Sequence, residues 1–238
     1  MNLEFLILDV LNSAGSRPPE FTTIHSNLSR DGITACLQEK LRYNNGHTIM
    51  PATIIPRLTM QHFYEMEALE LQFYDAEFIT PAAESWSWYE IYPHSTVAAE
   101  VDGKLAGFVN LFPVQPEVYH ELRAGRFNDH FMEQEHVAPL TQQPLHMFLS
   151  CILVDRQFRK MGLTRQLLQA AVQPYAALPC VGVVTDNVTA DGCAFSERYG
   201  FTRLHPSDHD SWIYEQPWPD FVKRVGSDKI CAPHPQKH

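Results

Sequence analysis

The chain has 238 residues, of which 45% are hydrophobic and 19% are charged, and its formal net charge is -10. This composition is typical of a folded globular protein and excludes a disordered chain, and the acidic balance disfavours a protein that grips nucleic-acid phosphates. No run approaches the roughly 18–20 apolar residues that cross a bilayer. The five cysteines include no Cys-x-x-Cys pair, so neither a disulfide framework nor a zinc ribbon is indicated. The expectation is a cytoplasmic protein with no membrane or nucleic-acid partner.

Residues 1–50 differ from the rest and are expected to form an N-terminal appendage of unknown role. Their first apolar run lacks a basic start and contains Glu4 and Asp9, so it does not resemble a signal peptide. A more regular pattern begins near Pro51. We therefore expect a main domain over 51–220 and a polar, frayed tail over 221–238.

The first half of this domain begins with a short strand and a helix. Thr59 is a good N-cap, and apolar residues recur after it at helical spacing (Phe63, Met66, Leu69 and Phe73). The dipeptide Asp102-Gly103 predicts a tight hairpin between two strands. The strands expected here are Ala52–Arg57, Ser95–Glu100 and Leu105–Pro113. The aromatic residues between 75 and 94 show no periodicity that selects an element.

The second half alternates between strands and helices. A polar stretch over 114–145, with a helix near Val118–Phe127, is longer than an ordinary connection, and a lid or a homodimer contact are hypotheses for it. After it, the pattern predicts a buried strand Met147–Val154, a helix Leu163–Val172, a strand Val181–Thr185, a helix Gly192–Tyr199 closed by Gly200, and strands Phe201–Leu204 and Ser211–Glu215. This order predicts an α/β protein with a mixed sheet and packed helices.

The segment Val154–Thr164 carries the strongest chemical signal. A buried strand ends, a short basic loop follows, and a helix begins at once, which exposes free N–H groups and the positive end of the helix dipole. Gly162 permits close approach of a ligand to the backbone. Four cations fall within ten residues: Arg156, Arg159, Lys160 and Arg165. The segment suits a pyrophosphate, although neither the Walker nor the Rossmann glycine pattern is present and an ordinary basic loop is the alternative.

The same segment resembles the acetyl-CoA motif of the GNAT superfamily of N-acetyltransferases. The motif positions are Val154, Phe158, Arg159, Gly162 and Thr164, and Thr164 departs from the family's Gly or Ala. A second stretch, Ala194–Phe201, is similar to the family's C-terminal helix and ends in the matching Gly200-Phe201. The resemblance covers about residues 52–216 and implies a GNAT-like acyl-CoA N-acyltransferase fold.

The resemblance also implies an activity and a cosubstrate. The protein is expected to be a transferase that moves an acetyl group from acetyl-CoA to a primary amine, on a small molecule or a protein, by direct attack in a ternary complex. The strand residues Ile152, Leu153 and Val154 would hold the pantetheine arm. The pyrophosphate would lie on the loop and helix start, formed by Arg159, Lys160, Met161, Gly162, Leu163 and Thr164.

The family's catalytic positions are altered in this chain. The usual tyrosine acid is replaced by Ser196, and Tyr199 on a neighbouring helical position is an alternative acid or a core residue. The usual glutamate base is replaced by Phe148, and His146 on the same strand face is an alternative base. These departures leave a second reading open, that of a catalytically weak CoA-binding or regulatory module.

Two further clusters have alternative interpretations. The segment His205–Asp210 has metal-friendly side chains, but its spacing matches no zinc template, so no metal site is expected. Trp86, Trp88 and Tyr89 would either line an acceptor pocket or pack in the core.

Overall fold

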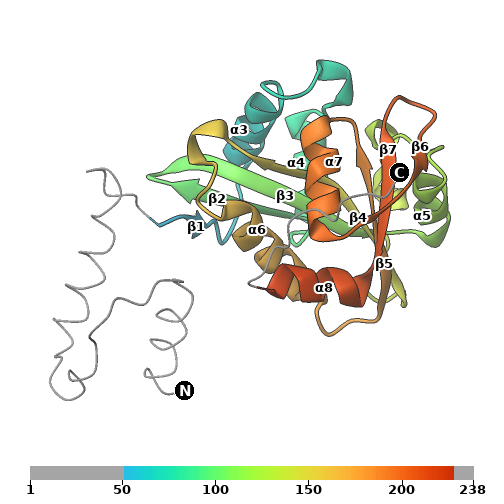
Figure 1. Cartoon of the computed structure of the whole chain (residues 1–238). Helices are drawn as coiled ribbons and strands as arrows, with labels where there is room; N and C mark the ends of the chain where they lie inside the picture. Colours follow the sequence, from blue (N-terminus) through green and yellow to red (C-terminus); the bar gives the residue numbers. More distant parts are fainter. Residues whose placement is uncertain (1–50, 228–238) are drawn as a thin grey trace, which may run out of the picture. The chain divides into compact units, whose positions relative to one another are not determined.

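Seven strands form one mixed sheet in the computed structural model, which describes residues 51–227 (Figure 1). The strands are β1 Thr53–Ile54, β2 Thr96–Val101, β3 Lys104–Val114, β4 Leu145–Val154, β5 Cys180–Asn187, β6 Thr202–Pro206 and β7 Trp212–Pro217. Their order across the sheet is β1-β2-β3-β4-β5-β7-β6. All neighbours are antiparallel except β4 and β5, which run parallel. The single parallel pair lies at the centre of the sheet.

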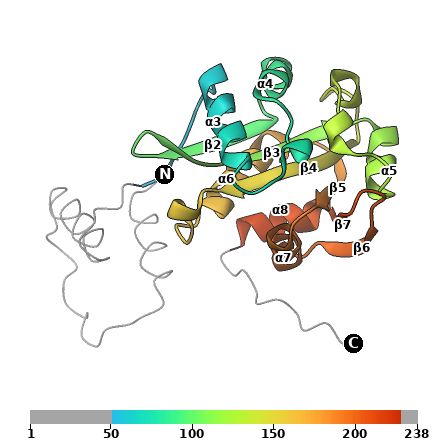
Figure 2. The same cartoon turned by 90° about the horizontal axis from the view of Figure 1, so that it is seen from above.

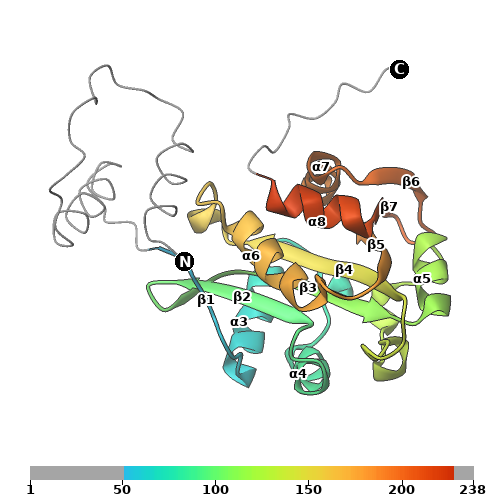
Figure 3. The same ribbon diagram turned by 90° about the horizontal axis from the view of Figure 1, so that it is seen from below.

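Helices cover both faces of this sheet. They are α3 Met60–Glu70, α4 Ala82–Ile91, α5 Pro116–Arg123, α6 Leu163–Val172, α7 Ala190–Tyr199 and α8 Trp218–Gly226. Short 3-10 turns are η1 Ala76–Phe78, η2 Asp129–Phe131, η3 Gln134–His136, η4 Arg156–Phe158 and η5 Gln173–Tyr175. Helices α3, α4 and α5 lie on one side, and α6, α7 and α8 lie on the other (Figures 2 and 3). Over residues 51–227, no helix is long and apolar enough to cross a membrane.

Three clusters of buried side chains form the core, one on the α6–α8 side of the sheet and two on the α3–α5 side, and alternate residues of the central strands contribute to them. On β3, Phe108 and Phe112 face α3, α4 and α5, whereas Val109 and Leu111 pack with α6 and α8. A bulge interrupts the pairing of β3 with β4, because the register shifts between Asn110 and Leu111. The bulge interrupts the alternation of side chains along β4. Residues after it therefore face the opposite side of the sheet from the one that strict alternation would give.

Most expected elements are confirmed, and one is reproduced to the residue. Helix α6 has the predicted bounds, and α7 ends on Gly200 in the left-handed conformation with φ 88°. The predicted hairpin between β2 and β3 turns on Asp102 and Gly103, whose φ values of 52° and 69° are those of a tight two-residue turn.

Two expectations need correction. The aromatic stretch without an assigned element contains α4. The predicted frayed tail after Asp220 is wrong as far as Gly226, because α8 buries Trp218, Phe221 and Val225 against the sheet. The expectations for residues 1–50 and 228–238 lie outside the described residues.

Candidate functional site

The central strands β4 and β5 pair only at their beginnings. Pairing joins Met147 to Val183 and Phe148 to Val184, and then stops. Beyond this point β4 stays with β3 as far as Val154, while β5 stays with β7. Within the described residues, the backbone groups of β4 that face β5 therefore lack a strand partner after Phe148. Such an edge can pair with an extended ligand that carries amide groups.

The loop after β4 leads directly into α6. Gly162 caps the helix with φ 75°, and Lys160 also has a positive φ of 69°. A Cβ atom at Gly162 would meet nothing within 4 Å. Across residues 51–227, no group accepts a hydrogen bond from the N–H groups of residues 160–164. The helix start thus offers unsatisfied donors in open space, an arrangement that suits a phosphate group.

Two arginines of this loop contact neighbouring elements. The guanidinium carbons of Arg156 and Arg159 lie 4.8 and 5.6 Å from the ring centroid of Phe73. Arg159 also pairs with Asp191 at the start of α7, with 3.3 Å between nitrogen and oxygen. Both partners of this ion pair are largely solvent-exposed, so it stabilises the loop weakly and can yield to an anionic ligand.

A cavity of about 130 Å³ lies where β4 and β5 diverge. Its lining comes from both faces of the sheet, since it includes Phe63 of α3 and Phe195 of α7. Ile152 of β4 and Thr185 of β5 also line it. The cavity therefore connects the two faces of the sheet through the gap between the strands.

Carboxyl groups line the α3 side of this cavity: Glu67, Glu70, Asp129 and Asp186. Burial raises the pKa of Glu70 to about 7, and the charges of Asp129 and Glu67 add to this effect while a contact with Cys151 opposes it. Burial likewise raises the pKa of Asp129 to about 6, supported by the charge of Asp186. The hydroxyl of Ser150 donates to Asp129 at 3.0 Å and opposes that rise. Among residues 51–227, neither a Lys nor an Arg lines the cavity.

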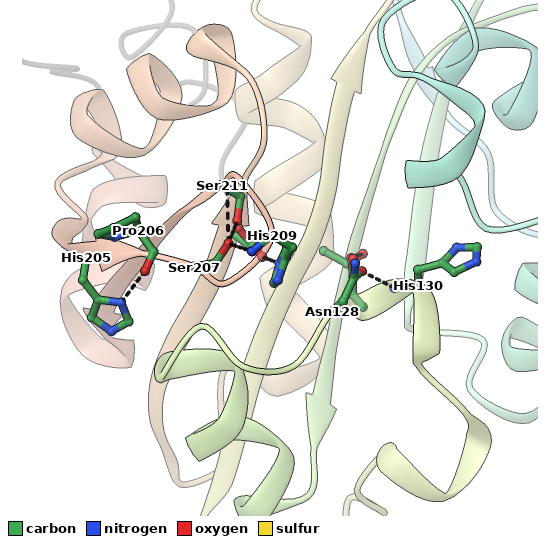
Figure 4. A network of polar contacts seen from close by, with 10 residues as sticks. Asn128, His130, His205, Pro206, Ser207, His209 and Ser211 are labelled. Carbon is green, nitrogen blue, oxygen red and sulfur yellow. Dashed lines mark hydrogen bonds and ion pairs between the residues drawn. The ribbon is translucent and has the colours of Figure 1, made fainter.

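His209 reaches the cavity from the turn between β6 and β7 (Figure 4). The hydroxyl of Ser207 accepts hydrogen bonds from the N–H groups of His209 and Ser211, at 3.1 and 3.2 Å, which fixes the turn. The His209 Nε2 atom hydrogen-bonds Asp186 Oδ2 at 2.6 Å. The Asp186 side chain is only 8% exposed, and its Oδ1 atom has no partner in the described part of the chain.

The turn holding Asp129 is fixed in a similar way. The side chain of Asn128 accepts from the N–H of His130 at 3.0 Å and so caps η2. Figure 4 shows Asn128 and His209 on either side of β4, and both line the cavity. The polar stretch after β3 therefore supplies part of the site.

No sequence motif predicts a function for His209 or singles out Asp186. The two residues lie 23 positions apart on different elements, so no local pattern pairs them. No group of three or more metal-ligating side chains occurs among the described residues.

The residues predicted for catalysis lie elsewhere. Ser196 is fully buried and accepts a hydrogen bond from the Asn187 side chain at 2.8 Å. Tyr199 is 2% exposed, and burial raises the pKa of its phenol. His146 packs beside Tyr119, and burial lowers its imidazole pKa. None of the three predicted residues lines the cavity.

The other predicted positions divide between cavity and core. Ile152 lines the cavity, whereas Leu153 is buried in the cluster under α3 and α4. Of the three aromatic residues on α4, Trp88 lines the cavity. Trp86 and Tyr89 instead pack on Phe63, with ring centroids 5.5 and 5.4 Å away.

Comparison with known proteins gives a consistent picture. The family model described as "Acetyltransferase (GNAT) family" matches residues 63–201, more than half of the chain. Ard1 from Thermoplasma volcanium has a similar structure, with a TM-score of 0.50 and 15% identity over 71% of this chain and 98% of that one. The loading GNATL domain of CurA from Lyngbya majuscula gives a TM-score of 0.52 and 10% identity over 70% and 97%. No curated protein sequence matches the chain. The expected fold is thereby confirmed.

Proposed function

The chain belongs to the acetyltransferase (GNAT) family, and on this premise we propose that it transfers an acetyl group from acetyl-CoA to a primary amine in a ternary complex. One observation carries the proposal. The gap between β4 and β5 opens on a carboxyl-lined cavity, and the end of β4 leads through a short loop to a helix start of the kind that binds phosphate. A long ligand with an anionic head and a reactive tail fits this path.

The residues present fit such a cosubstrate. The unpaired edge of β4 at Ile152, Leu153 and Val154 would bind the pantetheine arm, and the backbone of residues 159–164 would bind the pyrophosphate. The open space at Gly162 allows that approach. When bound, acetyl-CoA supplies a thioester whose acyl carbon accepts a nucleophile. Backbone donors of β4 would stabilise the oxygen that gains charge.

The amine must lose a proton to become nucleophilic. His209, oriented by Asp186, lies in the cavity and can take this proton. The amine nitrogen forms its bond to the acyl carbon while the carbon–sulfur bond breaks, and the electron pair leaves on the sulfur. Ser196, Tyr199 and His146 stay alternative proton carriers, but each would have to move to reach the cavity.

A second reading is a CoA-binding module with weak catalysis. It is favoured by one observation, the burial of Ser196 and Phe148 at the family's acid and base positions. Catalysis by His209 distinguishes the two readings, because a regulatory module needs no base in the cavity.

A thermal-melt comparison tests the cosubstrate first. Acetyl-CoA at 100 times its dissociation constant should stabilise the native state by about 2.7 kcal/mol. For a chain of this size that raises Tm by roughly 5–10 °C, while free adenine nucleotide at the same concentration should give a smaller rise. No rise with millimolar acetyl-CoA would contradict the proposal. Release of free CoA in the presence of amines then separates the enzyme from the module.

A further inference from the structure

The carboxyl groups of the cavity come from three elements and act on one another through their charges. Glu70 interacts electrostatically with Glu67 and with Asp129, and Asp129 interacts in turn with Asp186 and His209. These groups lie on α3, on η2 and at the end of β5, where the strands have diverged. Their acceptor oxygens outnumber the three donors of a single ammonium group.

Buried acceptors in this cavity are left without donors. Asp186 Oδ1 and Asn110 Oδ1 are both inaccessible to solvent and accept no hydrogen bond from any described residue. Both residues line the cavity, and only 8% of the Asp186 side chain is exposed. A buried acceptor without a partner destabilises a protein, so these atoms point to a ligand that brings several N–H donors.

We propose that the acceptor is a short aliphatic diamine or polyamine. The reacting amine would lie at Asp186 and His209, and a second ammonium group would lie between Glu67 and Glu70. This inference rests on the proposed acetyl transfer and names the substrate class of the same site. The amine that reacts gives its proton to His209, forms the bond to the acetyl carbon, and displaces CoA as the thiolate.

The remaining lining supports the same chemistry. An ammonium group carries three donors and no acceptor, which matches a wall of carboxylates and amide oxygens. Rings of Tyr74, Trp88 and Tyr92 offer faces for a cation and for methylene groups. Because no Lys or Arg of the described residues lines the cavity, the carboxylate of an amino acid would mainly meet carboxylates of the same charge. The volume of about 130 Å³ has room for a short unbranched chain.

A matched series of amines tests the proposal by turnover and by binding. With acetyl-CoA present, 1,4-diaminobutane should show a kcat/KM at least about tenfold above that of butylamine, the gain expected for one additional charge-assisted contact. Ornithine, which adds a carboxylate, should be a poor acceptor. Thermal melts with the dead-end ligand CoA should show the same ranking without any turnover.

Two glutamate substitutions on α3 sharpen the test. Glu70→Gln should lower the ratio of diamine to monoamine kcat/KM by about tenfold. Glu65→Gln is the matched control, since Glu65 lies on the same helix, bonds Gln61 at 3.1 Å and does not line the cavity. This variant should keep the wild-type ratio.

Several outcomes overturn the proposal. Equal kcat/KM for diaminobutane and butylamine refutes it while leaving acetyl transfer intact, as does a preference for the N-terminal amine of a tetrapeptide. If CoA binds but no amine is acetylated, the proposed function fails, and the melts then decide the ligand class alone. Stabilisation by diaminobutane over butylamine supports the diamine site even then, and its absence refutes it.

Discussion

Asp129 and Glu70 are buried carboxyl groups that ionise late in the folded protein. In the unfolded chain they ionise near 3.8 and 4.5, but in the native state their pKa values are about 6 and about 7. Between about pH 4 and pH 7 the native state therefore holds more protons than the unfolded state. Stability contributed by these groups is present in acid and is lost as the pH rises through this window.

The substitution Asp129→Asn should remove the part of this pH-dependent loss of stability that Asp129 causes. Asp129 changes pKa by about two units, worth at most about 3 kcal/mol at 1.4 kcal/mol per unit. Between pH 4.5 and pH 7, the free energy of unfolding of the variant should therefore rise relative to that of the wild type. Urea titration at each pH measures both. Asp210→Asn, an exposed carboxyl in the β6–β7 turn, is the control and should follow the wild type. A constant difference between wild type and Asp129→Asn across the range would contradict the assignment.

Substitutions of His209 and His146 distinguish the general base proposed from the structure from the one predicted from the sequence. His209→Gln should lower kcat by about 10²–10⁴-fold, the usual contribution of a general base, with little change in the affinity for acetyl-CoA. His146→Gln should change kcat less than about threefold, because His146 packs beside Tyr119 outside the cavity. Steady-state kinetics with an amine acceptor decides. The reverse result would restore the sequence-based assignment.

The start of α6 is the element on which cosubstrate binding depends. Gly162→Ala adds one methyl group at φ 75°, where a side chain costs about 1 kcal/mol of stability but meets no protein atom. We expect at least tenfold weaker acetyl-CoA binding, measured by calorimetry, because the methyl group occupies the space the pyrophosphate needs. Gly103→Ala is a matched control, since Gly103 has φ 69°, also with nothing within 4 Å, in the β2–β3 hairpin. Equal affinity in the two variants would mean that the α6 start does not bind the cosubstrate.

The sequence predicted those elements that are determined by residues close together in the chain. The bounds of α6 follow from its apolar spacing, and the hairpin follows from Asp102-Gly103. Helix α4 was not predicted, because its aromatic residues show no spacing that places them on one face of a helix. They are ordered by packing on Phe63. The cavity was not predicted from the sequence either. Asp186 and His209 meet only after β5 and the β6–β7 turn have been brought together, and no spacing in the sequence encodes that contact.

At the scale of the whole molecule, residues 51–227 should contain a complete fold. The chain matches 98% of the Thermoplasma volcanium structure with only 71% of its own length. A fragment of residues 51–227 should therefore melt cooperatively and keep the rise in Tm with acetyl-CoA. The predicted boundary at residue 220 provides the contrasting fragment, because it removes most of α8.

The fragment 51–220 should fail to fold. It lacks Phe221 and Val225, which are 0% and 1% exposed and lie in the core shared by α6, α8 and the sheet. Truncating a buried Phe alone costs about 3–5 kcal/mol, and the loss of the helix adds the exposure of its neighbours. Since a domain has only about 5–15 kcal/mol of stability, circular dichroism should show little or no cooperative transition for this fragment. If it melted within a few degrees of the 51–227 fragment, α8 would be an accessory helix and the functional unit would end near Asp220.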